Sequence, residues 1–236
     1  MTLPTAFSLL LTQVKSLFAL HINPRVHEKT GKELVTELDI ILSQEIKKFS
    51  TIQNIHLLSE EEDDKQMHYP MFILDPIDGT KEFVRGLPEY ALSLAFMESP
   101  LIDSPTNWGW VFNPVIDKFK IPSRTPGKLL GLVSRSEWDA GLYHNFKNND
   151  DIELFPVGSI AFKLFLLASN HCDFVITLKG KNLWDIAGGT IECQQQKIRL
   201  FHKTKPMESF NTIRYSAPMT WCLPDLFPII ADFFKL

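Results

Sequence analysis

The chain has 236 residues, of which 44% are hydrophobic and 22% are charged, and its formal net charge is −4. This composition is ordinary for a folded globular protein, and without a long basic block it argues against nucleic acid or a membrane surface as the main partner. Three widely spaced cysteines without a CxxC pair argue against a disulfide framework or a zinc site and favour a reducing cytoplasm.

Two helices are predicted in the first quarter of the chain. Apolar residues recur at helical spacing from Phe7 to Phe18, and since no basic segment precedes them we expect an amphipathic helix rather than a signal peptide. Residues 21–32 are polar and should form a loop or a short hairpin. A second helix is expected to begin at Thr36 and to end near Lys48. No apolar run approaches membrane-spanning length, so we expect no membrane insertion and a cytoplasmic location.

The next segments predict an antiparallel sheet. A short apolar segment covers residues 55–58 and leads into an acidic run. The apolar run 71–74 predicts a buried strand, and the patterns of 90–97 and 108–112 predict two neighbouring antiparallel strands. A turn is expected at Asn113–Pro114. With the two helices before them, these strands indicate a half of mixed α+β class.

A boundary is expected at residues 121–128, which contain two prolines and a glycine. Beyond it, predicted strands and helices alternate, which favours an α/β arrangement. We therefore divide the chain into an N-terminal α+β half, residues 1–128, and a C-terminal α/β half, residues 129–236. The alternating elements are strands at 129–133, 152–155 and 174–178 and helices at 137–146, 159–169 and 184–194.

Residues 75–84, which follow the predicted buried strand, form the most distinctive stretch of the chain. Asp75 and Asp78, separated by Pro and Ile, enter a tight turn that Gly79 closes. Gly79 and Thr80 then present backbone N–H groups where a helix could begin. Carboxylates suit a hard cation and such amides suit an anion, so the stretch indicates a site for a metal and a phosphate. Because Asp and Gly are also the commonest turn residues, an ordinary surface turn is the alternative.

Three further acidic features lie at the edges of predicted elements, and each has a structural alternative. The run Glu60–Asp64 follows an apolar segment and is compatible with a solvated loop. Asp39, three residues after Thr36, is compatible with a capping box in which Asp replaces Glu. Asp185 is compatible with a helix N-cap. Together with residues 75–84, these edge positions favour one shared site.

Six short motifs extend this pattern over much of the chain. They are Val35–Asp39, Leu58–Glu61, Asp75–Phe83, Val133–Glu137, Val157–Lys163 and Trp184–Gly188. In this order and spacing they resemble the magnesium-dependent inositol monophosphatase superfamily and, within it, the 3'(2'),5'-bisphosphate nucleotidase branch. The resemblance implies a layered αβαβα sandwich of the sugar-phosphatase type, with α+β and α/β character.

The resemblance also implies a metal-dependent phosphomonoesterase. Two or three Mg²⁺ ions would hold the phosphate and activate a water for direct attack, without a covalent phosphoenzyme. The metal ligands implied by the resemblance are Glu60, Asp75, the Ile77 backbone carbonyl, Asp78 and Asp185.

The remaining catalytic roles are implied in the same way. Thr80, together with either Glu60 or Asp39, would polarise the attacking water. The amides of Gly79 and Thr80 would hold the phosphoryl oxygens. The substrate is thus expected to be a small phosphorylated molecule.

The identity of that substrate depends on fewer residues. Lys81–Phe83 resembles the bisphosphate nucleotidase branch, and Leu178 stands where the inositol branch usually has a substrate-binding Glu. Lys179 and Lys181 follow and could receive a second phosphate, although a solvated loop is the alternative. We therefore expect hydrolysis of 3'-phosphoadenosine 5'-phosphate, a by-product of sulfate assimilation, to AMP and phosphate.

Several alternatives stay open at this point. Ser159 and Lys163 are also expected to reach the substrate, although a lysine on a helix face is more often solvated. An inositol or other sugar monophosphatase is the alternative enzyme, and a phospholigand-binding homologue without turnover is the alternative class. The resemblance further implies inhibition by Li⁺ and formation of a homodimer.

The chain departs from the family pattern mainly in its second half. The segment 114–133 is shorter than usual, and Ala187–Gly189 reads Ala-Gly-Gly where the family has Ala-Ala-Gly. The extra glycine lowers helix propensity by roughly 1 kcal/mol, which close backbone packing could compensate. Residues 193–197 lack the usual Glu-Ala-Gly-Gly, and beyond them only a strand at 213–217 is family-like. These departures concern the substrate pocket and leave the implied metal ligands intact.

Overall fold

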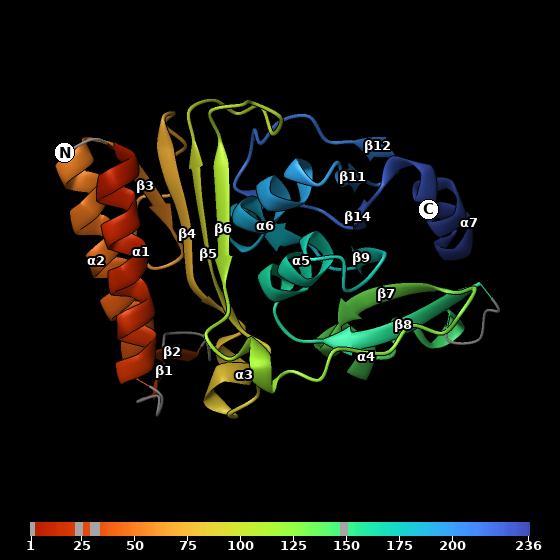
Figure 1. Ribbon diagram of the computed structural model, residues 1–236. Helices are drawn as coiled ribbons and strands as arrows, with labels where there is room; N and C mark the ends of the chain where they lie inside the picture. Colours follow the sequence, from red (N-terminus) through yellow and green to blue (C-terminus); the bar gives the residue numbers. More distant parts are fainter. Residues whose placement is uncertain (1–2, 22–25, 29–33, 147–150) are drawn as a thin grey trace.

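Two β-sheets alternate with three layers of helices. The computed structural model describes residues 3–21, 26–28, 34–146 and 151–236. The helices that form the layers are α1 (Leu3–Leu20), α2 (Glu37–Gln53), α4 (Arg135–Asp139), α5 (Ile160–Ala168), α6 (Leu183–Gln195) and α7 (Phe227–Phe234). The pair α1 and α2 covers the outer face of the first sheet, α5 and α6 lie between the sheets, and α4 and α7 lie beyond the second sheet (Figure 1). The predicted αβαβα sandwich is confirmed.

The first sheet has four strands in the order β3-β4-β5-β6. Its strands are β3 (His56–Ser59), β4 (Met71–Asp78), β5 (Ala91–Met97) and β6 (Trp108–Phe112). The pair β3 and β4 is parallel, and the other two pairs are antiparallel, so the antiparallel prediction is correct for three of the four strands. The short strands β1 (Val26–Glu28) and β2 (Leu34–Thr36) pair antiparallel beside this sheet. Of the segment 21–32, predicted as a loop or a short hairpin, β1 forms part, whereas residues 22–25 and 29–32 lie outside the described residues.

Side chains of β4 alternate between two cores. Phe72 and Leu74 belong to the core that α1 and α2 share with the first sheet, whereas Met71 and Ile73 belong to the core that contains α5 and α6. This alternation follows from the two-residue period of a strand. It places the next residue, Asp75, on the face of the sheet that points toward α5 and α6.

The second sheet has six strands in the order β12-β11-β14-β9-β7-β8. Its strands are β7 (Leu129–Ser134), β8 (Ile152–Val157), β9 (Phe174–Thr177), β11 (Arg199–His202), β12 (Lys205–Pro206) and β14 (Met219–Cys222). The predicted α/β alternation is correct for β7, β8 and β9, which pair in parallel. The later strands pair antiparallel, so the sheet is mixed.

Two predictions for the second half were wrong in detail. The expected helix over 137–146 is the five-residue α4 followed by the 3₁₀ turn η2 (His144–Phe146), because Gly141 at φ +80° interrupts the helical path. The expected strand at 213–217 is only β13 (Arg214–Tyr215), which pairs with β10 (Lys181–Asn182). Short elements not predicted at all are η1 (Ile116–Lys118), η3 (Pro224–Leu226), β11, β12, β14 and α7.

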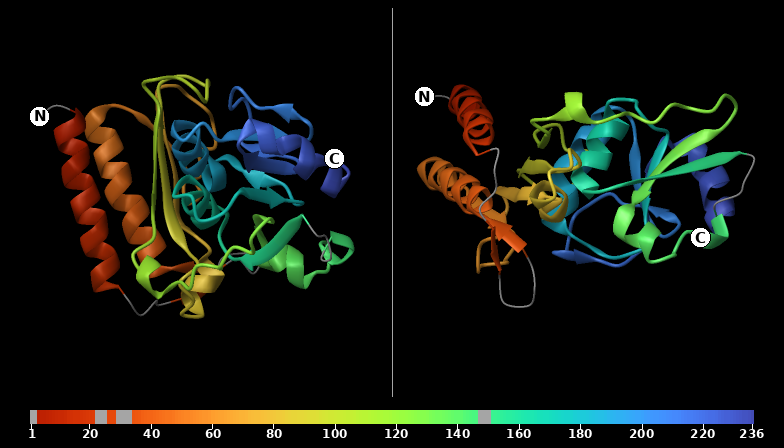
Figure 2. Two further views of the ribbon diagram at one scale, coloured as in Figure 1. Left: turned by 45° about the vertical axis from the view of Figure 1, so that its right-hand side comes forward. Right: turned by 90° about the horizontal axis from the view of Figure 1, so that it is seen from below.

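The middle helices pack closely on both neighbouring layers, and Figure 2 shows them between the two sheets. A Cβ on Gly188 would lie 2.8 Å from the Ser93 Oγ and 3.0 Å from the Leu94 carbonyl oxygen in β5. A Cβ on Gly189 would lie 2.5 Å from the Cβ of Leu164 in α5. Both glycines of α6 are therefore used for close packing, which compensates their low helix propensity.

None of the helices in the described residues is long and apolar enough to cross a membrane.

Candidate active site

A cleft of about 430 Å³ opens where β4 ends, between the first sheet and the N-terminal ends of α5 and α6. It contains all five residues that the resemblance assigns to the metal, together with the two residues assigned to the phosphate. The described residues that line it are Leu34, Glu60, Asp75, Ile77, Asp78, Gly79, Thr80, Lys81, Glu82, Ile160, Lys181 and Asp185. The fold therefore brings these distant sequence motifs to one place.

Asp75 is the most deeply buried acid of the cleft, with 2% of its surface exposed. Its Oδ1 has no hydrogen-bond partner among the described residues. Burial raises the pKa of this carboxyl well above its usual range, and the nearby Glu60, Asp78 and Asp185 carboxylates raise it further. A buried carboxylate oxygen without a donor, among other carboxylates, is stabilised by a bound cation.

Asp78 is held by the first turn of α5. Its Oδ2 accepts hydrogen bonds from the Ser159 Oγ at 2.6 Å and from the Ala161 backbone N–H at 2.6 Å. The ladder between β4 and β5 shifts register between Asp75 and Asp78, where Pro76 lacks an N–H to donate. The irregularity turns the end of β4 out of the sheet and into the cleft.

Asp185 lies in the first turn of α6. The N-cap of this helix is Asn182, so the structural alternative that Asp185 is itself the cap was wrong. The Asp185 Oδ2 accepts the Asn182 N–H at 2.9 Å, which completes a capping box. Burial, followed by the charge of Asp78, raises the pKa of Asp185 to about 7.

The acidic run at 60–64 is tied to the rest of the molecule at several points. Its first residue, Glu60, lines the cleft, and its N–H donates to the Leu74 carbonyl at 3.2 Å. Lys65 donates to the carbonyls of Ser59 and Glu60 at 2.5 and 2.8 Å. Its ammonium also lies 4.7 Å from the centre of the Trp184 ring. The solvated-loop alternative is thus correct for exposed members of the run and not for Glu60.

Asp39 and Thr80 each make a local hydrogen bond that bears on their expected roles. Asp39 Oδ2 accepts from the Thr36 N–H at 2.7 Å and from the Thr36 hydroxyl at 2.6 Å, so the capping box is confirmed. Asp39 is 3% exposed and is not among the described residues that line the cleft, although its charge also raises the pKa of Asp75. The Thr80 hydroxyl donates to the Ile77 carbonyl at 2.9 Å.

The lysines are placed differently from the sequence expectation. Lys163 is 2% exposed, and its ammonium donates to three backbone carbonyls rather than reaching the cleft. Burial lowers the pKa of Lys163 to about 7. Lys179 is also absent from the described lining of the cleft, while Lys181 is part of it. The expected substrate contact of Lys163 is therefore corrected, and Lys181, rather than Lys179, joins Lys81 among the basic residues that line the cleft.

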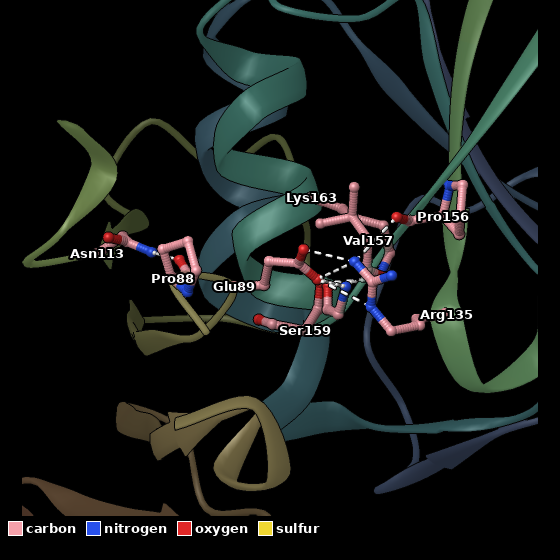
Figure 3. Close-up of polar contacts among 9 residues, drawn as sticks. Pro88, Glu89, Asn113, Arg135, Pro156, Val157, Ser159 and Lys163 are labelled. Atoms are coloured by element: carbon pink, nitrogen blue, oxygen red, sulfur yellow. Dashed lines mark hydrogen bonds and ion pairs between the residues drawn. The ribbon is translucent and has the colours of Figure 1, made fainter. Parts of the chain in front are cut away.

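Glu89 and Arg135 join the two halves beside the cleft (Figure 3). Sequence reasoning did not single out Glu89 and noted Arg135 only as part of the motif Val133–Glu137. Arg135 donates to both carboxylate oxygens of Glu89 at 2.5 and 2.6 Å. The two residues are 46 positions apart, and neither belongs to a local pattern that would indicate the pairing. Glu82, a further acid of the cleft, was noted only as part of the Lys81–Phe83 motif.

The donors of the cleft fit a hard divalent cation. Carboxylate and carbonyl oxygens are the ligands that Mg²⁺ prefers, and among the described residues that line the cleft five carboxylates face only two ammonium groups. Within the described chain, no three or more acidic, histidine or cysteine side chains are already grouped closely enough to hold a metal ion.

Comparisons with known proteins show the family of the chain. A model of the inositol monophosphatase family matches residues 5–131, more than half of the chain. The fructose-1,6-bisphosphatase/inositol-1-monophosphatase of Thermotoga maritima is 29% identical over 208 residues, which cover 77% of each chain. The 3'(2'),5'-bisphosphate nucleotidase CysQ of Escherichia coli K12 is 24% identical over 159 residues, which cover 58% of this chain and 62% of CysQ.

Solved structures share the fold over almost the whole chain. An IMPase of Thermotoga maritima has a TM-score of 0.73 at 22% identity and covers 96% of this chain and 94% of its own. An IMPase/NADP phosphatase solved with Mg²⁺ and phosphate has a TM-score of 0.74 at 16% identity and covers 98% and 94%. The family match and these likenesses lead to one conclusion: the chain belongs to the inositol monophosphatase family.

Proposed function

We propose that the protein is a Mg²⁺-dependent phosphomonoesterase. The observation that carries the proposal is the buried Asp75 carboxylate, whose Oδ1 has no donor among the described residues and whose neighbours are Glu60, Asp78 and Asp185. A family relative solved with Mg²⁺ and phosphate gives independent support. A protein that only bound a phosphorylated ligand would be better served by cationic side chains than by this set of acids.

The proposed metal ligands are Glu60, Asp75, Asp78, Asp185 and the Ile77 carbonyl, which would hold two or three ions. When bound, Mg²⁺ polarises the phosphoryl oxygens, lowers the pKa of water and stabilises the leaving oxygen. The side chains of Asp75 and Asp78 reach the cleft from one strand end, and Asp185 reaches it from the facing helix.

The chain's own residues would orient the attacking water. Because the Thr80 hydroxyl donates a hydrogen bond to the Ile77 carbonyl, its oxygen would accept a hydrogen bond from that water and so orient it. Glu60 lines the cleft and would take up the one proton that the water loses, so we favour it over Asp39 as the base. The water oxygen then forms a new bond to phosphorus, the ester P–O bond breaks, and the leaving oxygen takes a proton from solvent.

Asp75→Asn tests the metal site. We expect the rate of phosphate release with Mg²⁺ to fall about 100-fold or more, since a ligand charge is lost. Without metal, the variant should unfold at a temperature at least as high as the metal-free wild type does, because the substitution removes one negative charge from a cluster of carboxylates. Phosphate release and thermal unfolding are the measurements. Undiminished turnover would contradict the proposed site.

For the substrate we propose 3'-phosphoadenosine 5'-phosphate, which makes the protein a 3'(2'),5'-bisphosphate nucleotidase. Lys81 and Lys181 are the cations of the cleft, and either can bind a phosphate that is not being hydrolysed. The match to CysQ supports this choice. An inositol or sugar phosphatase is the second candidate, because the Thermotoga maritima relative matches a larger share of the chain.

A substrate panel with two lysine variants separates these candidates. Wild-type protein should release phosphate faster from the bisphosphonucleotide than from inositol 1-phosphate or fructose 1,6-bisphosphate. Lys181→Met should raise the KM for the bisphosphonucleotide about tenfold, as expected for loss of a charged hydrogen bond. Lys179→Met should raise it less, because Lys179 lies outside the described cleft lining. Faster hydrolysis of inositol 1-phosphate would contradict the nucleotidase proposal and support the second candidate function, an inositol or sugar phosphatase.

A further inference from the structure

The turn Val157–Ser159, called here the anchor turn, connects β8 to α5 and is held from inside by a buried lysine. The Lys163 ammonium donates to the carbonyls of Val157, Gly158 and Ser159 at 3.0, 2.9 and 2.8 Å. All three donor sites of the ammonium are therefore used on one turn (Figure 3). A charge buried this deeply is costly unless it is fully hydrogen-bonded, so its contacts determine the shape of the turn.

The anchor turn is held from the other half of the chain by Glu89. The Gly158 N–H donates to the Glu89 carboxylate at 2.6 Å. Arg135 donates to the same carboxylate and also to the Pro156 carbonyl at 3.2 Å. Glu89 is 7% exposed, so this pairing is shielded from solvent and salt. Figure 3 shows the Glu89 carboxylate facing Arg135, with Val157 and Ser159 of the anchor turn beside them.

The contacts of Lys163 and Glu89 with the anchor turn keep the Ser159 backbone in an uncommon conformation. This conformation determines how Ser159 contacts Asp78. Ser159 has φ +42°, a region that residues other than glycine rarely occupy. In this conformation its Oγ accepts the Phe162 N–H at 3.0 Å and donates to the Asp78 Oδ2. Ala161 donates to the same oxygen. One oxygen of Asp78 is thereby fixed by the second half of the molecule.

We propose that Lys163 and Glu89 are positioning residues that align the Asp78 carboxylate for metal binding by holding the anchor turn from two sides. This inference depends on the proposed metal site. It adds to that site a group of supporting residues that come from both halves of the chain. Neither residue is among the described residues that line the cleft. The link runs from Lys163 and Glu89 through the anchor turn and the Ser159 hydroxyl to Asp78.

Binding of Mn²⁺, followed by electron paramagnetic resonance, tests the link without depending on turnover. Lys163→Met keeps the length of the side chain and removes its donors. We expect this variant, folded by circular dichroism, to bind at least one Mn²⁺ about 10- to 100-fold more weakly. Its kcat should fall by a similar factor while the KM for the phosphomonoester changes little. Lys163→Arg should not restore binding, because a planar guanidinium cannot replace a three-donor point charge.

Tyr69→Phe is the matched control. The Tyr69 hydroxyl donates to the Phe210 carbonyl at 2.8 Å and so also joins the two halves, but it lies before β4, at the end opposite Asp75 and Asp78. This variant should bind Mn²⁺ as the wild type does. If Tyr69→Phe weakened binding as much as Lys163→Met, the effect would be general loosening of the fold and the proposal would be wrong.

Two further variants make the outcome decisive. Asp75→Asn should weaken Mn²⁺ binding directly, so normal binding in that variant would overturn the proposed function itself. Weak binding in Asp75→Asn with normal binding in Lys163→Met would overturn only the positioning role. Should Lys163→Met fail to fold, Ser159→Ala tests the same link by removing the hydroxyl that donates to Asp78. We expect Ser159→Ala to bind Mn²⁺ about tenfold more weakly, and wild-type binding there would refute the proposal.

Discussion

Two acids of α6 have similarly raised pKa values for different physical reasons. Burial raises the pKa of Asp185 to about 7 with a contribution from Asp78, and Asp185 lines the cleft. Burial alone raises the pKa of Glu192 to about 7, and its Oε1 accepts the Val111 N–H at 2.9 Å in β6. A raised pKa therefore identifies a site only when neighbouring charges and an open cleft accompany it.

Glu192 provides a prediction for stability against pH. Its pKa is raised from 4.5 to about 7 on folding, so the unfolded chain releases this proton at lower pH than the folded protein. The free energy of unfolding should therefore decrease as the pH rises from 4.5 to about 7. Above pH 7 the contribution lost at this one group reaches its maximum, up to about 3 kcal/mol. Glu192→Gln keeps an acceptor for the Val111 N–H and removes the titration. We expect urea unfolding at pH 8 to show the variant about 1–3 kcal/mol more stable than wild type.

The control for that prediction is the same pair of proteins at pH 4.5. There the Glu192 carboxyl is protonated in the folded state, so the advantage of the variant should largely disappear. An advantage of equal size at both pH values would show that the stabilisation does not come from ionisation.

Among elements, α6 carries the most constraints. It supplies Asp185 to the cleft, it packs on β5 through Gly188, and it packs on α5 through Gly189. The carbonyl of Gly188 would lie only 2.1 Å from a Cβ placed on Gly109 of β6. The helix thus sits against the first sheet at backbone distance, and this contact places Asp185 opposite Asp75.

Gly188→Ala should be destabilising although alanine is the better helix former. The gain in propensity is about 1 kcal/mol, and the overlap with the Leu94 backbone should cost about 1–3 kcal/mol. We expect a lower thermal midpoint and reduced turnover, because the shifted helix moves Asp185. Gln195→Ala, on an exposed position of the same helix, is the control and should change neither. A stabilised Gly188→Ala protein would contradict the packing argument.

At the scale of the whole molecule, the two halves share a core. One cluster of buried residues includes Leu58 and Ile73 of the first sheet, Leu164 of α5, Ile186 of α6 and Val175 of the second sheet. The cleft likewise takes Asp75 and Asp78 from one half and Asp185 from the other. We therefore regard the halves 1–128 and 129–236 as consecutive segments of the chain that depend on each other for stability, and not as independently folding domains.

Separate expression of these halves tests the dependence. Each fragment alone should lack near-ultraviolet circular dichroism and cooperative thermal unfolding, because it exposes its side of the shared core. The complete chain, measured in the same buffer, is the reference. Cooperative unfolding of either fragment would show that it is an independent domain.

The sequence by itself determined the features that depend on neighbours along the chain. The capping box of Thr36 and Asp39, the buried strand that leads from Met71 into Asp75 and the helical start after Gly79 all follow from short-range spacing. Asp75 and Asp78 were found in the same way, whereas Glu60 and Asp185 were assigned to the metal by the family resemblance.

Only the tertiary structure decided what depends on distant segments. Lys163 and Lys181 are both lysines near predicted site motifs, yet one is buried against three carbonyls and the other lines the cleft. The Glu89–Arg135 pair and the last antiparallel strands likewise arise from pairings between remote positions. Such contacts are fixed by how the layers pack, because burial and charge pairing are properties of the folded surface and not of local sequence.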